Sequence, residues 1–167
     1  MPMYDRITEE QAQLIREARV FFVASVHPEF SLGPADDGPV NLSPKGGVPL
    51  HIIDDHQVAY LDYPGSGNET ARHAKAGAPV TVMVMSTSAE DAAIVRLYGH
   101  AAIESIDESP LAEELLDEVT GFLKNPRQVI TITVDRTQTS CGYGVPVYDY
   151  VGERDQSGRG RTYKETR

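Results

Sequence analysis

Residues 50–62 read LHIIDDHQVAYLD, and this stretch fixes the class of fold that the chain can form. Two mainly apolar runs, 50–53 and 58–62, flank the short polar segment 54–57. Strands joined by so short a segment pair in antiparallel fashion, because a parallel pair needs a crossover of about a dozen residues or more. The stretch therefore predicts a β-hairpin within an antiparallel sheet.

The sequence on both sides of this hairpin supplies more strands with equally short connections. Apolar or alternating runs predict strands at 20–26, 40–43, 80–85, 93–106, 128–134 and 147–151. We expect Pro44 to end the short segment at 40–43, and Gly99 to mark a β-bulge or a close backbone approach.

Three short helices complete the expected elements. A capping box at Thr8 begins the first, residues 69–76 form the second, and Ser109 begins the third, whose apolar stripe includes Val119 and Phe122. Most connections are too short for parallel crossovers. We therefore expect a mainly β fold, a small closed antiparallel barrel with peripheral helices.

Composition limits the classes of partner. The chain has 167 residues, enough for one domain, which we place at 1–151, followed by a basic tail at 152–167. Its net charge of −10 argues against binding to nucleic acid. One cysteine, Cys141, permits no intrachain disulfide, and no apolar run is long enough for a membrane helix. Without a visible signal peptide, these features predict a cytoplasmic protein that does not interact with membranes.

A glycine-rich junction between a strand and a helix is the strongest candidate binding motif. Residues 65–70 read GSGNET, in which glycine lets an anion approach the backbone while Ser66, Asn68 and Thr70 supply polar groups. The same residues also fit a helix cap that needs no ligand. The motif matches neither a Walker loop nor a dinucleotide fingerprint.

A second candidate motif is NLSPKG at residues 41–46. It places an amide, a hydroxyl and a cation, those of Asn41, Ser43 and Lys45, within five positions. Such a group suits a phosphate or an electron-rich ring edge, although a solvent-exposed polar turn has the same composition. Arg127 also needs a partner, either a ligand or an acid such as Asp62 or Glu69.

A third candidate is SCGYGVP at residues 140–146. The glycines beside Tyr143 leave its ring able to lie against a flat ligand, although a tight turn would look the same. Cys141 has no histidine near it in sequence, so we do not expect it to act as a nucleophile. The five histidines show no metal-ligand spacing, and we expect no metal site.

In order along the chain, these segments resemble one known family. The resemblance covers roughly residues 8–151, including the motifs above and the stretches AxxFFVAS at 18–25, RLYG at 96–99 and RQVI at 127–130. It is to the pyridoxamine 5′-phosphate oxidase-related family of FMN-binding split-barrel proteins. This implies a six-stranded antiparallel split β-barrel that works as a homodimer, with FMN in a cleft at the dimer interface.

The resemblance also implies a flavoprotein, and an oxidoreductase acting on an unidentified small molecule. It assigns no catalytic residue. The residues implied in cofactor binding are Asn41, Ser43, Lys45, Asp62, Ser66, Gly67, Asn68, Thr70, Arg127, Gln128, Cys141 and Tyr143. Tyr143 would cover the site from the partner chain.

The sequence departs from the family pattern at two places, which affect the expected phosphate-binding residues and the expected reaction. Gly67 and Asn68 stand where many members have Arg-Lys, so Lys45 and Arg127 become the candidate cations for the phosphate. The chain has no Trp and lacks the Arg-Leu-x-Pro ending of pyridoxamine phosphate oxidases, which argues against that reaction. Alternatives left open are a flavin-storage protein without catalysis and a split barrel that binds F420 or haem.

Overall fold

The computed structural model describes residues 1–30, 38–65, 68–117 and 125–154. In these ranges the strands are β1 (Met3–Tyr4), β2 (Val20–Val26), β3 (Val40–Gly46), β4 (His51–Asp54), β5 (Gln57–Asp62), β6 (Pro79–Met85), β7 (Ala93–Ser105) and β8 (Gln128–Cys141). The helices are α1 (Glu9–Glu17), α2 (Glu69–Lys75) and α3 (Ala112–Asp117). None of the helices in the described ranges is both long and apolar enough to cross a membrane.

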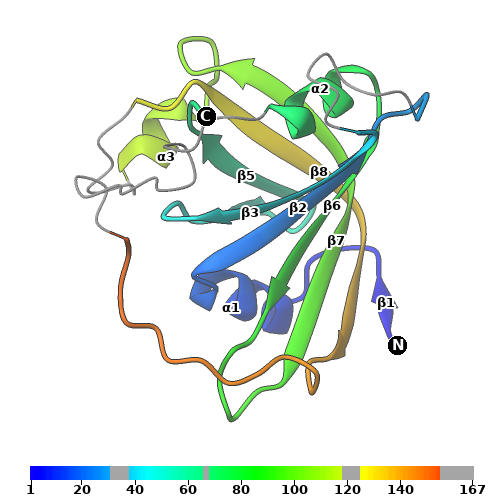
Figure 1. Cartoon of the computed structure of the whole chain (residues 1–167), viewed down its shortest axis with the longest axis vertical. Coiled ribbons are helices and arrows are strands. Elements are labelled where there is room, and N and C mark those ends of the chain that lie inside the picture. Colours follow the sequence, from blue (N-terminus) through cyan, green and yellow to red (C-terminus); the bar gives the residue numbers. More distant parts are fainter. Residues whose placement is uncertain (31–37, 66–67, 118–124, 155–167) are drawn as a thin grey trace, which may run out of the picture.

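All eight strands belong to one antiparallel sheet. Their order is β3-β2-β6-β7-β8-β5-β4, and β1 pairs with β8 near residues 137–138. Figure 1 shows the strongly curved sheet, with α2 and α3 near one end and α1 near the other. The expected mainly β, antiparallel architecture is confirmed.

Two details of the predicted barrel are wrong. Within the described ranges the sheet has eight strands, whereas the resemblance implies six. One of the eight, β1, is two residues long and too short to leave a sequence pattern. The sheet is also not closed, because β3 and β4 form its two edges.

Several predicted elements occur where the sequence placed them. The hairpin of β4 and β5 is confirmed, as are β2, β6, β7 and α2 within a residue or two. The capping box is confirmed as well, because Thr8 Oγ1 accepts from the Gln11 amide and Gln11 Oε1 accepts from the Thr8 amide. Gly99 lies at a register shift between β7 and β8, which confirms the predicted bulge.

Other predicted boundaries are wrong. Pro44 does not end its strand, since β3 continues to Gly46. Proline is tolerated there because β3 is an edge strand, with one side that makes no sheet hydrogen bonds. The strand predicted at 147–151 does not form, and β8 instead extends to Cys141. The third helix begins at Ala112, and its predicted stripe residues Val119 and Phe122 lie outside the described residues.

The hydrophobic core lies on the concave face of the curved sheet. Alternation along β2 places Phe21 and Val23 in this core, where the Phe21 ring meets the Tyr60 ring edge-on at 5.2 Å. β5 is buried on both faces, because Ala59 and Leu61 pack in a second cluster with α3. The end of β5 is thereby held firmly where its last residue, Asp62, meets the start of α2.

Candidate functional site

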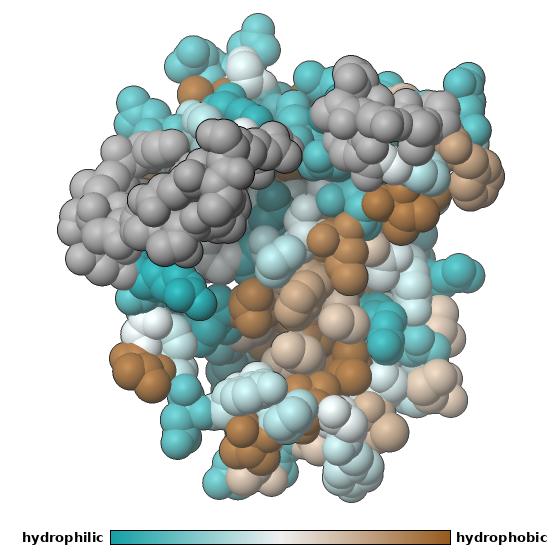
Figure 2. All heavy atoms as spheres, in the orientation of Figure 1, coloured by the Kyte–Doolittle hydropathy of each residue, from teal (hydrophilic) through white to brown (hydrophobic). Residues whose placement is uncertain are grey.

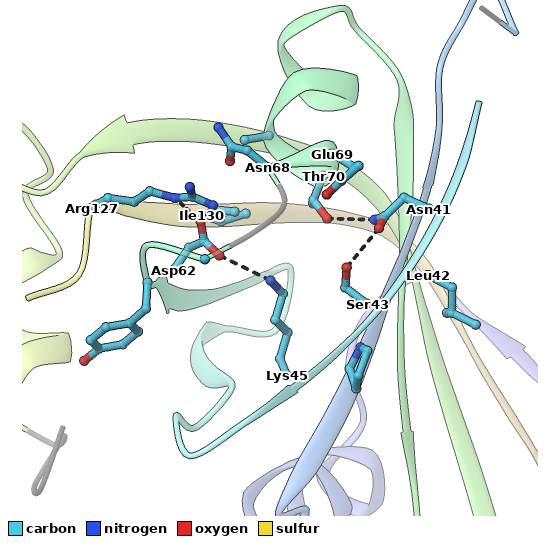
Figure 3. Close-up of a pocket in the computed structure, with 14 residues that line it drawn as sticks. Asn41, Leu42, Ser43, Lys45, Asp62, Asn68, Glu69, Thr70, Arg127 and Ile130 are labelled. Atoms are coloured by element: carbon cyan, nitrogen blue, oxygen red, sulfur yellow. Dashed lines mark hydrogen bonds and ion pairs between the residues drawn. The ribbon is translucent and has the colours of Figure 1, made fainter. Parts of the chain in front are cut away.

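A pocket of about 370 Å³ lies between β3, the end of β5 and the start of α2. Figure 3 shows Lys45 of β3 pointing toward Asp62 of β5, and Asn41 and Ser43 of β3 lying beside Thr70 of α2, whereas Leu42 points away from them. The pocket is lined by Asn41, Leu42, Ser43, Pro44, Lys45, Asp62, Tyr63, Gly65, Asn68, Glu69, Thr70, Ala71, Arg127 and Ile130.

Asp62 is the centre of the charged side of this pocket. Its carboxylate accepts from Lys45 Nζ at 3.2 Å and from Arg127 Nε and Nη2 at 2.8 and 2.7 Å. The Asp62 side chain is 6% exposed, whereas those of Lys45 and Arg127 are 23% and 27% exposed. The predicted pairing of Arg127 with an acid such as Asp62 is confirmed. Lys45 and Arg127 thus share one buried carboxylate, and Glu69 is the other acid among the described residues that line the pocket.

Gln128 connects this charged group to α2. Its Nε2 donates to Asp62 Oδ2 at 2.8 Å and to Asn68 Oδ1 at 3.0 Å. Asn68 is the N-cap of α2, but its side chain makes no capping hydrogen bond. The Asn68 amide therefore ties the start of α2 to β8 instead.

A network of uncharged groups forms the opposite wall. Asn41 Nδ2 donates to Thr70 Oγ1 at 3.0 Å, and Ser43 Oγ donates to Asn41 Oδ1 at 2.9 Å (Figure 3). Behind them, Asn41 Nδ2 also donates to Ser25 Oγ at 3.2 Å, and Ser25 Oγ lies 2.9 Å from His73 Nδ1.

The structure brings most of the predicted site residues together. Those that line the pocket or bond to its lining are Asn41, Ser43, Lys45, Asp62, Asn68, Thr70, Arg127 and Gln128. Ser66 and Gly67 lie outside the described residues. Within the described ranges, no group of three or more His, Cys, Asp or Glu side chains is placed to hold a metal ion.

Cys141 and Tyr143 lie far from the pocket of their own chain. They are at and just beyond the other end of the 14-residue β8, which places them about 40 Å along the strand from Gln128. Both are exposed, and 88% of Tyr143 is accessible to solvent. A role for them in binding stays a prediction that needs a second chain.

Ser25 and His73 belong to this site but are not among the residues that the resemblance implies in cofactor binding. Ser25 follows Phe21 and Val23 at an inward-facing position of β2, and it is 5% exposed. A hydroxyl at a core position of an apolar strand was the signal that could have identified it. His73, at 2% exposed, gave no comparable signal because a histidine inside a short helix is common on surfaces.

Comparison with known proteins assigns the family. A sequence profile of pyridoxamine 5′-phosphate oxidase matches residues 7–141. The chain belongs to the pyridoxamine 5′-phosphate oxidase family. A curated member of this family, the Aspergillus flavus protein UstO, is 29% identical over 153 residues, covering 89% of this chain. The match covers 58% of UstO, so the chain spans little more than half of that relative's length.

Solved structures confirm the split-barrel fold of the family. HupZ from Group A Streptococcus matches with a TM-score of 0.60 at 23% identity, over 78% of this chain and 91% of its own. A protein from Syntrophomonas wolfei, described as FMN-binding, matches with a TM-score of 0.54 at 14% identity, over 77% and 86% of the two chains. At these identities the likeness shows the fold alone.

Proposed function

We propose that the protein is a cytoplasmic FMN-binding oxidoreductase that holds the cofactor in the Asp62 pocket. The observation that supports this most strongly is the pair of cations, Lys45 and Arg127, presented on one wall by a buried carboxylate. In a chain of net charge −10, such a group is suited to an anionic ligand. A phosphate monoester carries about −1.5 to −2 charges near neutral pH and three acceptor oxygens, which fits these donors.

The polar groups around the cations fit the rest of this cofactor. Lys45, Arg127 and Thr70 would hold the phosphate, and Ser43 would face the hydroxyl groups of the ribityl chain. Because α2 has only seven residues, we assign the phosphate charge to the two cations rather than to the helix start. Bound FMN would supply the redox chemistry, by accepting electrons from one small molecule and passing them to another.

We also propose that two copies of the chain form a dimer that closes this pocket. The outer face of β3 exposes 68% of Val40 and 66% of Leu42, and the neighbouring outward residues of β2, such as Phe22, are half-buried. Figure 2 shows apolar side chains gathered over the middle of the face on which Figure 1 draws β2 and β3. Because Leu42 also lines the pocket, a second copy on this face would cover its open side.

The ligand that copurifies with the protein tests the cofactor. We expect the yellow absorption of an oxidised flavin, and FMN in the denatured supernatant by mass spectrometry. If the protein purifies without ligand, it should take up FMN on titration. A haem Soret band, a deazaflavin spectrum or no FMN binding would contradict the proposal. Bound FMN without turnover of any reductant would favour the flavin-storage alternative.

A further inference from the structure

A chain of hydrogen bonds leads from the pocket wall to a buried histidine. It joins Thr70 and His73 on α2 to Asn41 on β3 and Ser25 on β2. These four residues are between 2% and 9% exposed, so water does not compete for their polar groups. Ser43 joins the chain at Asn41 from the pocket side.

The partners of Ser25 set the direction of these bonds. In the described part of the chain, Ser25 Oγ has two partners, Asn41 Nδ2 and His73 Nδ1. The amide nitrogen can only donate, so the Ser25 hydroxyl proton has His73 Nδ1 as its acceptor. With Nδ1 as this acceptor, the His73 ring is neutral and carries its own proton on Nε2.

The same direction continues to the pocket. Both amide hydrogens of Asn41 are used, one on Ser25 and one on Thr70, and its carbonyl oxygen accepts from Ser43. Thr70 Oγ1 accepts, and no acceptor for its own proton lies among the described residues. The Thr70 hydroxyl can therefore donate to a ligand, whereas the Ser43 hydroxyl proton is engaged and its oxygen is left to accept.

A proton on His73 Nδ1 would reverse each of these bonds. Ser25 would then donate to the Asn41 carbonyl oxygen, the Asn41 amide would turn over, and Thr70 would donate inward. We propose that His73 is a positioning residue, which acts through Ser25 and Asn41 to keep the Thr70 hydroxyl as a donor to an anionic oxygen in the pocket. The identity of that anion as the FMN phosphate rests on the proposed function, whereas the bond directions do not.

The tautomer of His73 tests the bond directions without any ligand. Two-dimensional ¹⁵N–¹H NMR of the imidazole rings in the wild-type protein should show His73 with an unprotonated Nδ1 and a protonated Nε2 at neutral pH. Slow hydrogen exchange of the Asn41 side-chain amide is expected in the same sample. A proton on His73 Nδ1 would overturn the inference, whether or not the protein binds FMN.

Paired substitutions at His73 test the consequence for binding. Leucine in H73L removes the acceptor, whereas asparagine in H73N offers a carbonyl oxygen near the position of Nδ1. We expect H73L and T70A each to weaken FMN binding about tenfold, the effect of one hydrogen bond to a charged group, with riboflavin affinity nearly unchanged. H73N should recover most of the loss, and the control H100L, at an exposed histidine, should show none.

The double variant H73L/T70A shows whether His73 affects FMN binding through Thr70 or independently of it. If His73 acts through Thr70, the double variant binds FMN about as weakly as T70A alone. Losses that multiply, or an H73N variant as weak as H73L, would overturn the inference. A wild-type protein that binds no FMN would instead contradict the proposed function, and the NMR measurement would still decide the role of His73.

Discussion

Asp62 is the residue on which the geometry of the pocket depends most. Its buried carboxylate accepts hydrogen bonds from Lys45, Arg127 and Gln128, which come from β3 and from the start of β8. Without it, two cations would repel each other in a partly buried place. Asp62 therefore both stabilises the junction of these strands and fixes the direction of the groups that face the ligand.

Replacing Asp62 with asparagine should destabilise the protein. Breaking a buried ion pair leaves uncompensated charge, so we expect D62N to lower the free energy of unfolding by about 3 kcal/mol. The control D135N removes an exposed partner of His100 and should cost under about 1 kcal/mol. Urea denaturation of both variants checks this, and equal losses would contradict the role assigned to Asp62.

Tyr60 carries a buried hydroxyl with no hydrogen-bond partner in the described ranges. Replacing it with phenylalanine removes this unsatisfied group, so Y60F should raise the free energy of unfolding by about 1 kcal/mol at neutral pH. Thermal and urea unfolding measure the change. A loss of stability of similar size would show that the hydroxyl has a partner after all.

The same tyrosine predicts a dependence on alkaline pH. Burial raises the pKa of Tyr60 well above its usual value, and the nearby Asp62 carboxylate raises it further. The folded chain keeps this proton while the unfolded chain releases it above about pH 10, so stability falls as pH rises beyond that point. Between pH 9 and 11 the free energy of unfolding should fall less steeply in Y60F than in the wild type. Equal slopes would contradict this account.

At the level of the elements, the packing of β7 against β8 depends on one glycine. A Cβ atom at Gly99 would lie 1.9 Å from the Thr133 carbonyl oxygen, which belongs to the backbone and cannot turn aside. We therefore expect G99A to destabilise the protein by at least about 3 kcal/mol. The matched control G144A meets no atom within 4 Å and should be nearly neutral. If G99A unfolds at the same urea concentration as G144A, the Thr133 backbone does not approach Gly99 as closely as described here.

Local sequence patterns predicted those elements whose structure is determined by residues close together in the chain. The apolar run of β2, the hairpin of β4 and β5 and the bulge at Gly99 all follow from residues near one another in the chain. The continuation of β3 through Pro44 could not be predicted in this way, because it depends on β3 being an edge strand. The prediction of a strand at 147–151 was wrong, since this run pairs with no strand among the described residues.

The sequence predicted individual residues of the site, but not the hydrogen bonds and ion pairs that connect them. Lys45, Asp62 and Arg127 were each singled out in sequence, yet the distance from Asp62 to Arg127 is 65 positions along the chain. That juxtaposition arises because β5 and β8 pair with Asp62 opposite Gln128. Ser25 and His73 are not among the residues implied in cofactor binding, because the direction of a side chain inside the fold is a property of the tertiary structure.

For the whole molecule, the proposed dimer makes a distinct prediction. A carboxylate at position 42 would lie on the exposed apolar face beside the pocket. We expect L42E to be a monomer by light scattering and to bind FMN at least about tenfold more weakly, because burying an unpaired charge is costly. The control L116E, on α3, should remain dimeric with normal affinity. A monomeric wild type would contradict the dimer itself.

The comparison of FMN with riboflavin tests the central claim most directly, because the two differ in the phosphate group. If Lys45 and Arg127 bind the phosphate, the wild type should prefer FMN by at least about tenfold in fluorescence titrations. The single variants K45M and R127M should each lose most of this preference while R136M, at an exposed arginine of β8, keeps it. Equal affinity of the wild type for FMN and riboflavin would contradict the account.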